Sequence, residues 1–314
     1  MKGLLPRQVH PILQLLMLVG LAVAGLSLAS LLALILANQV YGVSLTQFGE
    51  LSAKPQAAPH AWAVLMLLQG LSLAGLGAGA AVLPLVLQQS PSDYFAPRRL
   101  AAAWGPLGAA VLIVCLIPLL STIVTWNAGV HFPAFLHDFE LWARGMEDQA
   151  TDITKYLTNF STPGRLGVGL LVIALVPAIA EELVFRGVVQ RNLVRWFASR
   201  HVGVWLAAAV FSAVHMQFFG FVPRFLLGLV LGYLYEWSGN ILVPMAAHFT
   251  QNAFQLVLIY LAQSHRLPTS FDPDANQVLP WPTVLVSAVL SAALLYGLRQ
   301  RWATPPAAPA TPVS

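Results

Sequence analysis

The sequence predicts an all-α fold, a polytopic transmembrane helical bundle of about eight spans, and two observations support it. Hydrophobic residues make up 58% of the 314 residues and charged residues only 9%, with a mean hydropathy of +0.73. Soluble proteins carry about a quarter charged residues. Apolar runs of about 20 residues, enough to cross the hydrocarbon core as a helix, also recur along the chain. The chain is therefore expected to be a membrane protein.

The apolar runs define the spans in order. The first follows Lys2 and Arg7 and is longer than a signal-peptide core, so it is expected to be retained. The fourth begins near Leu166 and ends around Glu181 and Glu182, and the short sixth is rich in glycine. The expected spans cover residues 11–37, 61–87, 101–126, 166 to about 182, 202–219, 225–237, 241–262 and 281–298.

The basic residues predict the orientation. With eight spans and a cytoplasmic N-terminus, ten of the sixteen lysines and arginines fall in cytoplasmic segments, as the positive-inside rule favours. We therefore expect a multi-pass protein of the cell membrane with both termini cytoplasmic. The ten basic residues are Lys2, Arg7, Arg98, Arg99, Arg186, Arg191, Arg195, Arg200, Arg299 and Arg301.

Segments outside the spans add less. The loop 129–165 contains "FPAFLHDFELWARGMEDQATDITKYL", whose apolar spacing predicts an amphipathic helix on the membrane surface, with a docking role and a plain solvated connector as alternatives. The Pro/Ala-rich tail 303–314 is expected to be disordered. The single cysteine, Cys115, excludes a disulfide framework and a cysteine-rich metal site. Scattered basic residues argue against a nucleic-acid partner.

Two adjacent glutamates at the end of an uncharged run are the most informative feature. An ionised side chain near the bilayer centre costs about 3 kcal/mol, so such residues need a reason. Glu182 and Arg186 are four residues apart, which predicts an ion pair on one helix face. Glu181 points about 100° away and must find its partner on another helix or in trapped water. Pro177 is expected to kink the helix and open it to water.

Polar groups on two later spans complete the pattern. His215 ends "FSAVH" in the fifth span, and His248 and Asn252 share a face of the seventh in "HFTQN". Their convergence on Glu181 requires that the fourth span run further, or the fifth start later, than drawn. Such a cluster can activate water, although a single intramembrane His or Asn is equally often a packing contact between helices. Glu236, near a span end, is expected at the interface.

The three motifs resemble those of a known family. "EELVFR" reads as E-E-x-x-x-R, "FSAVH" as F-x-x-x-H and "HFTQN" as H-x-x-x-N, in this order on a membrane chain. Together they resemble the CPBP family of intramembrane proteases, also called the CAAX prenyl endopeptidase or Abi family, over residues 164–262. The organisation expected is an N-terminal region of three spans plus the external loop (1–163), a protease-like core (164–263), and a final span with the tail (264–314).

The resemblance implies roles for six residues. Glu181 would be the catalytic base, and His215 would help to hold and deprotonate a water. Glu182 and Arg186 would form a supporting ion pair. His248 and Asn252 would stabilise the oxyanion, commonly a large contribution to such reactions.

The metal and the substrate stay open. Two histidines and a glutamate could bind zinc, and the family has been called a metalloprotease for that reason. Against zinc, the motif H-E-x-x-H is absent. The family has also been described as a metal-free hydrolase, and we prefer that interpretation. The expected partners are membrane lipid and a membrane-associated protein or peptide substrate, prenylated or linked to bacteriocin immunity. The alternatives are a non-enzymatic membrane scaffold or binding protein, and a proton-coupled carrier, which no visible inverted repeat supports.

Overall fold

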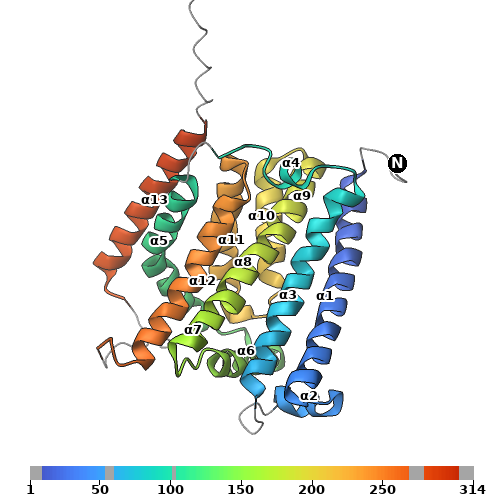
Figure 1. The fold of residues 1–314 in the computed structure, drawn as a ribbon. Helices are drawn as coiled ribbons and strands as arrows, with labels where there is room; N and C mark the ends of the chain where they lie inside the picture. The colour runs from blue at the N-terminus through green and yellow to red at the C-terminus, as the bar shows by residue number, and fades with distance from the viewer. Residues whose placement is uncertain (1–8, 54–59, 101–103, 269–278, 304–314) are drawn as a thin grey trace, which may run out of the picture.

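A computed structural model describes residues 9–53, 60–100, 104–268 and 279–303, and these form a bundle of helices (Figure 1). Every regular element within these ranges is helical, so the all-α prediction is confirmed. The predictions made for Lys2, Arg7 and residues 304–314 lie outside the described part of the chain.

The axes of the longer helices are roughly aligned with one another (Figure 1). Those of the N-terminal region are α1 (Pro11–Tyr41), α2 (Leu45–Ala53), α3 (Ala61–Val86), α4 (Pro91–Phe95), α5 (Trp104–Ala128) and α6 (His137–Leu157). A long helix, 163–197, then contains α7 (Pro163–Gly169), α8 (Val176–Glu182) and α9 (Arg191–Phe197). It is followed by α10 (Arg200–Ala213), α11 (Phe221–Ser238), α12 (Leu242–Gln263) and α13 (Trp281–Ala303). α1 packs along α3, α10 against α11, and α5 against α12 and α13.

Among the described residues, six helices are long and apolar enough to cross a membrane: 11–41, 61–86, 104–128, 163–197, 218–238 and 281–302. The other two expected spans exist as helices without meeting that standard. α10 has only 14 residues, and α12 carries polar residues such as the buried His248 and the partly exposed Gln251 and Asn252. The start of α1 and the end of α13 lie at the same end of the bundle (Figure 1). This is the arrangement expected for an even number of crossings.

The predicted end of the fourth span is wrong. The helix continues past the glutamates to Phe197, with π-helical turns at Leu170–Leu175 and Leu183–Gln190 on either side of α8. Its later polar residues turn inward: Arg186 is 1% exposed, and Gln190 donates a hydrogen bond to the carbonyl of Gly232 at 3.0 Å. Arg186, expected in a cytoplasmic segment after the span, instead lies inside a continuous helix. Since π-helical turns often mark functional sites, their position beside Glu181 and Glu182 is informative.

The predicted fifth span is too long. α10 ends at Ala213, and Met216 has a left-handed φ of 54°, which ends the helix. His215 therefore lies in a turn after α10, and a short 3₁₀ helix, Phe218–Gly220, leads into α11.

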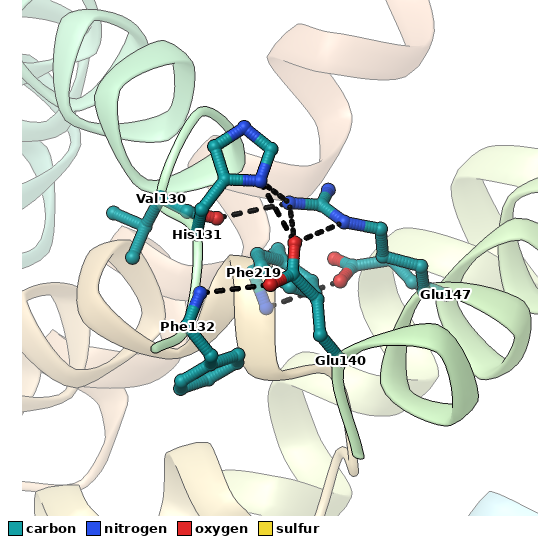
Figure 2. Close-up of polar contacts among 7 residues, drawn as sticks. Val130, His131, Phe132, Glu140, Glu147 and Phe219 are labelled. Atoms are coloured by element: carbon teal, nitrogen blue, oxygen red, sulfur yellow. Dashed lines mark hydrogen bonds and ion pairs between the residues drawn. The ribbon is translucent and has the colours of Figure 1, made fainter. Parts of the chain in front are cut away.

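The external loop forms the predicted helix, α6, and a cluster of hydrogen bonds around Glu140 holds it in place (Figure 2). The carboxylate of Glu140 accepts hydrogen bonds from His131 Nδ1 at 2.9 Å, the backbone N–H of Phe132 at 2.8 Å and Arg144 Nε at 2.9 Å. Arg144 also donates to the carbonyl of Val130 at 2.9 Å. These hydrogen bonds attach the segment that precedes α6 to the helix. Whether α6 lies on the membrane surface stays a prediction.

The hydrogen-bond cluster around Glu140 favours the ionised form of its carboxyl group. The N–H of Phe132 foremost, with Arg144 and His131, lowers the pKa of this carboxyl from 4.5 to about 2. A carboxyl whose pKa is lower in the folded state stabilises the fold above its ordinary pKa. That stabilisation is lost as the pH falls from 4.5 toward about 2.

We predict that Glu140→Gln lowers the melting temperature at neutral pH and that the difference from the unmodified protein shrinks as the pH falls below about 4.5. The measurement is thermal unfolding of the purified protein across a pH series. Asp148→Asn is the matched control, because Asp148 is an exposed carboxylate of the same helix. An equal loss at neutral and acid pH would contradict the assigned role of the charge.

Candidate active site

A buried chain of three charged or polar side chains lies at the centre of the bundle. Glu182 Oε1 accepts hydrogen bonds from Arg186 Nη1 at 2.6 Å and from His248 Nδ1 at 2.8 Å. Glu182 is 0% exposed, and Arg186 and His248 are buried beside it. The predicted ion pair between Glu182 and Arg186 is present, whereas the contact from Glu182 to α12 was not predicted.

Arg186 ties the long helix to two further helices. Its Nη2 donates to the carbonyl of Gly228 in α11 at 3.1 Å, and its guanidinium lies 4.6 Å from the ring centroid of Phe211 in α10. Gly228 also permits close packing of α11 on α10, because a Cβ there would lie 3.1 Å from the Cβ of Ala208. Removing one partner of a buried ion pair costs about 3 to 5 kcal/mol, so Arg186 and Glu182 hold these helices together.

The carboxylate of Glu181 makes no hydrogen bond to any other described residue. Its Oε2 lies 3.8 Å from His248 Nε2, too far for a hydrogen bond, and its side chain is 15% exposed. Next to Glu181, the backbone of α3 packs closely against α8, since a Cβ on Gly77 would lie 2.9 Å from Ala180. The carboxylate therefore sits inside the bundle with a free oxygen available to a water or substrate.

His215 interacts electrostatically with this carboxylate and has one ring nitrogen fixed. Its Nδ1 is 2.8 Å from the carbonyl of Phe211, and a carbonyl only accepts, so Nδ1 carries the hydrogen. The neutral ring then has a free acceptor at Nε2. Glu181, His248 and Arg224 all act electrostatically on His215, which places the four groups in one neighbourhood.

The segment that follows His215 is held from outside the predicted core. Glu147 of α6 accepts a hydrogen bond from the N–H of Phe219 at 3.1 Å (Figure 2). Asn127 of α5 accepts one from the N–H of Val222 at 2.9 Å. The guanidinium of Arg144 also lies 4.0 Å from the Phe219 ring centroid. Sequence reasoning missed these contacts, because nothing in the local pattern of α6 indicates which turn it covers.

Contacts and electrostatic interactions link five of the six predicted site residues to one another. The sixth, Asn252, follows His248 by one turn of α12, and its side chain makes no hydrogen bond to another described residue. Phe211, known from the sequence only as the first letter of F-x-x-x-H, is central: its ring lies 5.1 Å from that of His215 and 6.0 Å from that of His248. Glu236 lies near the end of α11 and accepts from Gln190 at 3.0 Å.

Metal binding finds no ready site in the described part of the chain. No group of three or more His, Cys, Asp or Glu side chains is placed there to hold an ion. His248 Nδ1 is occupied by Glu182, and Nε2 is the nitrogen that faces Glu181. The donors do not fit a preformed zinc site, so no chemical step is derived through a metal.

Comparisons with known proteins agree with the motifs. Residues 163–254 match the family described as type II CAAX prenyl endopeptidase Rce1-like, which confirms the resemblance inferred from the sequence. The uncharacterized protein YpbD of Bacillus subtilis (strain 168) is 36% identical over 88 residues, covering 27% of this chain and 42% of that relative. The chain thus spans less than half the length of this relative. No solved structure matches significantly.

Proposed function

We propose that the chain is an intramembrane endopeptidase that hydrolyses a peptide bond with water activated by Glu181 and His215. The observation that carries this proposal is an unpaired, largely buried carboxylate beside two histidines, in the segment that matches the CAAX endopeptidase family. A carboxylate poised next to an imidazole acceptor is suited to general-base catalysis.

The proposed reaction uses the free atoms of the site. A water donates hydrogen bonds to the carboxylate of Glu181 and to Nε2 of His215, and its oxygen attacks the peptide carbonyl while Glu181 takes the proton. The tetrahedral oxyanion then collapses, the carbon–nitrogen bond breaks, and the proton passes from Glu181 to the leaving nitrogen. Each of these transfers is a familiar task of a positioned side chain.

The oxyanion would be stabilised by groups of α12. His248 Nδ1 donates to Glu182, so Nε2 can donate to the oxyanion only when the ring is protonated. The side-chain amide of Asn252, free of other hydrogen bonds among the described residues, is the second proposed donor. Glu182 and Arg186 act through His248 as positioning residues.

The proposed substrate follows from the helices that carry the site. A site among apolar, membrane-spanning helices favours a membrane-associated protein or apolar peptide, prenylated or not, cut near the cytoplasmic face of the cell membrane. In this proposal residues 164–263 form the core, and the flanking regions control access. No metal is required.

A first prediction separates catalysis from packing. Glu181→Gln should lower kcat by at least about 100-fold at an unchanged melting temperature, because the Glu181 side chain makes no hydrogen bond to another described residue. Glu182→Gln should lower both, since it breaks contacts to Arg186 and His248. The assay is cleavage of quenched fluorescent peptides ending in a CAAX sequence, farnesylated or not, by protein in liposomes. Full cleavage by Glu181→Gln would refute the proposed base; a scaffold would show no cleavage with the unmodified protein.

A second prediction concerns metal. The cleavage rate should be unchanged after incubation with 1,10-phenanthroline and removal of free ions, because the donors form no preformed metal site. The measurement is the initial rate with and without chelator, with metal content determined on the same sample. Loss of activity that zinc restores would contradict the metal-free mechanism.

Arg224 points to an anionic group on the substrate. Its Nη1 is buried without a hydrogen-bond partner, while its Nη2 contacts the side-chain oxygen of Gln217. It also acts electrostatically on both Glu181 and His215. A guanidinium with unused donors is suited to a carboxylate. Such a group is present at the free C-terminus of a peptide cut near its end.

We therefore predict that Arg224→Gln raises KM about tenfold for a peptide with a free C-terminal carboxylate, the usual size of one lost charged hydrogen bond. The same peptide as a C-terminal amide should be cleaved equally by both proteins. Arg266→Gln, which removes an exposed arginine, is the control. An equal KM change for acid and amide would contradict carboxylate recognition.

A further inference from the structure

A second polar site lies at one end of the bundle. A pocket of about 320 Å³ is lined by Arg98, Arg191 and Arg195 and by one acidic residue, Glu236. It lies between the segment after α4, the start of α9 and the end of α11. Arg191 follows Glu181 by ten residues on the same helix, roughly 15 Å at the usual rise, so the pocket is separate from the candidate active site.

Arg98 is fixed on the turn between α11 and α12. Its N–H donates to the carbonyl of Gly239 at 3.0 Å, and its carbonyl accepts from Asn240 Nδ2 at 2.9 Å. Its Nη1 donates to the carbonyl of Trp237 at 3.2 Å. The side chain lies against Gly239, where a Cβ would be 2.7 Å from Arg98 Cδ. The guanidinium is therefore held in place with Nε and Nη2 unused.

The other two arginines add positive charge without a matching acid. Arg191 donates to the carbonyl of Tyr94 and lies 4.1 Å from the centroid of that ring. Arg195 is exposed and forms no hydrogen bond or ion pair with any described residue. Glu236 pairs with none of the three arginines within the described ranges and instead accepts from Gln190. Three guanidinium groups facing one carboxylate leave the pocket two charges positive.

The pocket lies at the depth expected for lipid headgroups. The apolar helices 163–197 and 218–238 both end beside it, and α4 and α9 lie at the same end of the bundle (Figure 1). Trp196 and Phe197, stacked 5.3 Å apart and exposed, follow Arg195 directly. Aromatic side chains gather where the hydrocarbon core meets the headgroups. An anion reaching this pocket from the bilayer would thus be a headgroup phosphate.

We propose that this pocket binds the phosphate of an anionic membrane lipid, with Arg98 and Arg195 as its main donors. Guanidinium groups match phosphate oxygens with paired hydrogen bonds. Basic pockets between transmembrane helices recognise anionic headgroups in this way. The bound lipid would bridge the 96–98 segment to α9 and so join two parts of the helical bundle. This inference is independent of the proposed hydrolysis.

The test measures lipid binding to the delipidated full-length protein in neutral detergent by native mass spectrometry. Phosphatidylglycerol should bind saturably and more tightly than phosphatidylcholine. Arg195→Gln should weaken phosphatidylglycerol binding about tenfold, the usual effect of one charged hydrogen bond, and Arg195→Lys should lose less. Arg299→Gln, an exposed arginine near the end of α13, should leave binding unchanged. Millimolar inorganic phosphate should not displace the lipid.

The outcomes that overturn the proposal are distinct. Equal weakening by Arg195→Gln and Arg299→Gln would show a general charge effect instead of a site. Equal affinity for both lipids would exclude recognition of net negative charge. Displacement by inorganic phosphate would assign the pocket to a soluble anion and overturn the lipid assignment. Because Arg195 makes no contact that folding needs, an unchanged melting temperature shows that the variant is folded.

Discussion

The carboxylate of Glu182 holds this bundle together. An ionised group that is fully buried must be compensated, and Glu182 is compensated twice through one oxygen, by Arg186 on its own helix and by His248 on α12. Arg186 extends the network to the backbone of α11 and the ring of Phe211 in α10. One anion thereby fixes the mutual positions of four helices, and packing around it can place a reactive group accurately.

The reactivity of Glu181 follows from the pairing of Glu182. Successive residues of a helix point about 100° apart, so the one local cation can serve only one of the two glutamates. Glu182 takes Arg186, and Glu181 faces His248 Nε2 and the neighbourhood of His215 without a hydrogen bond. The two acids therefore differ in role because of helical phase, although they are adjacent and chemically identical.

The sequence predicted what depends on local spacing and missed what depends on helix neighbours. The pair Glu182 and Arg186 follows from their separation, and the helical fold follows from hydropathy. The bond from Glu182 to His248 could not be predicted, since no local pattern says that α12 packs against α8. The fourth span was ended too early because inward-facing Arg186 and Gln190 resemble loop residues. Arg224 was not identified from the sequence, because it directly precedes the expected span 225–237.

The contacts that were hardest to predict from the sequence also blur the expected division into an N-terminal region and a protease-like core. The residues around His215 come from the matched segment, yet the segment that follows it is bonded to Glu147 and Asn127, which belong to the N-terminal region. The interior network fixes His248 and Glu182, while α5 and α6 hold the segment that follows His215. A water held between Glu181 and His215 would thus contact two side chains whose neighbouring segments are held by different sets of contacts. The geometry of the proposed site is therefore a property of both regions, because neither alone supplies the supports of both histidines.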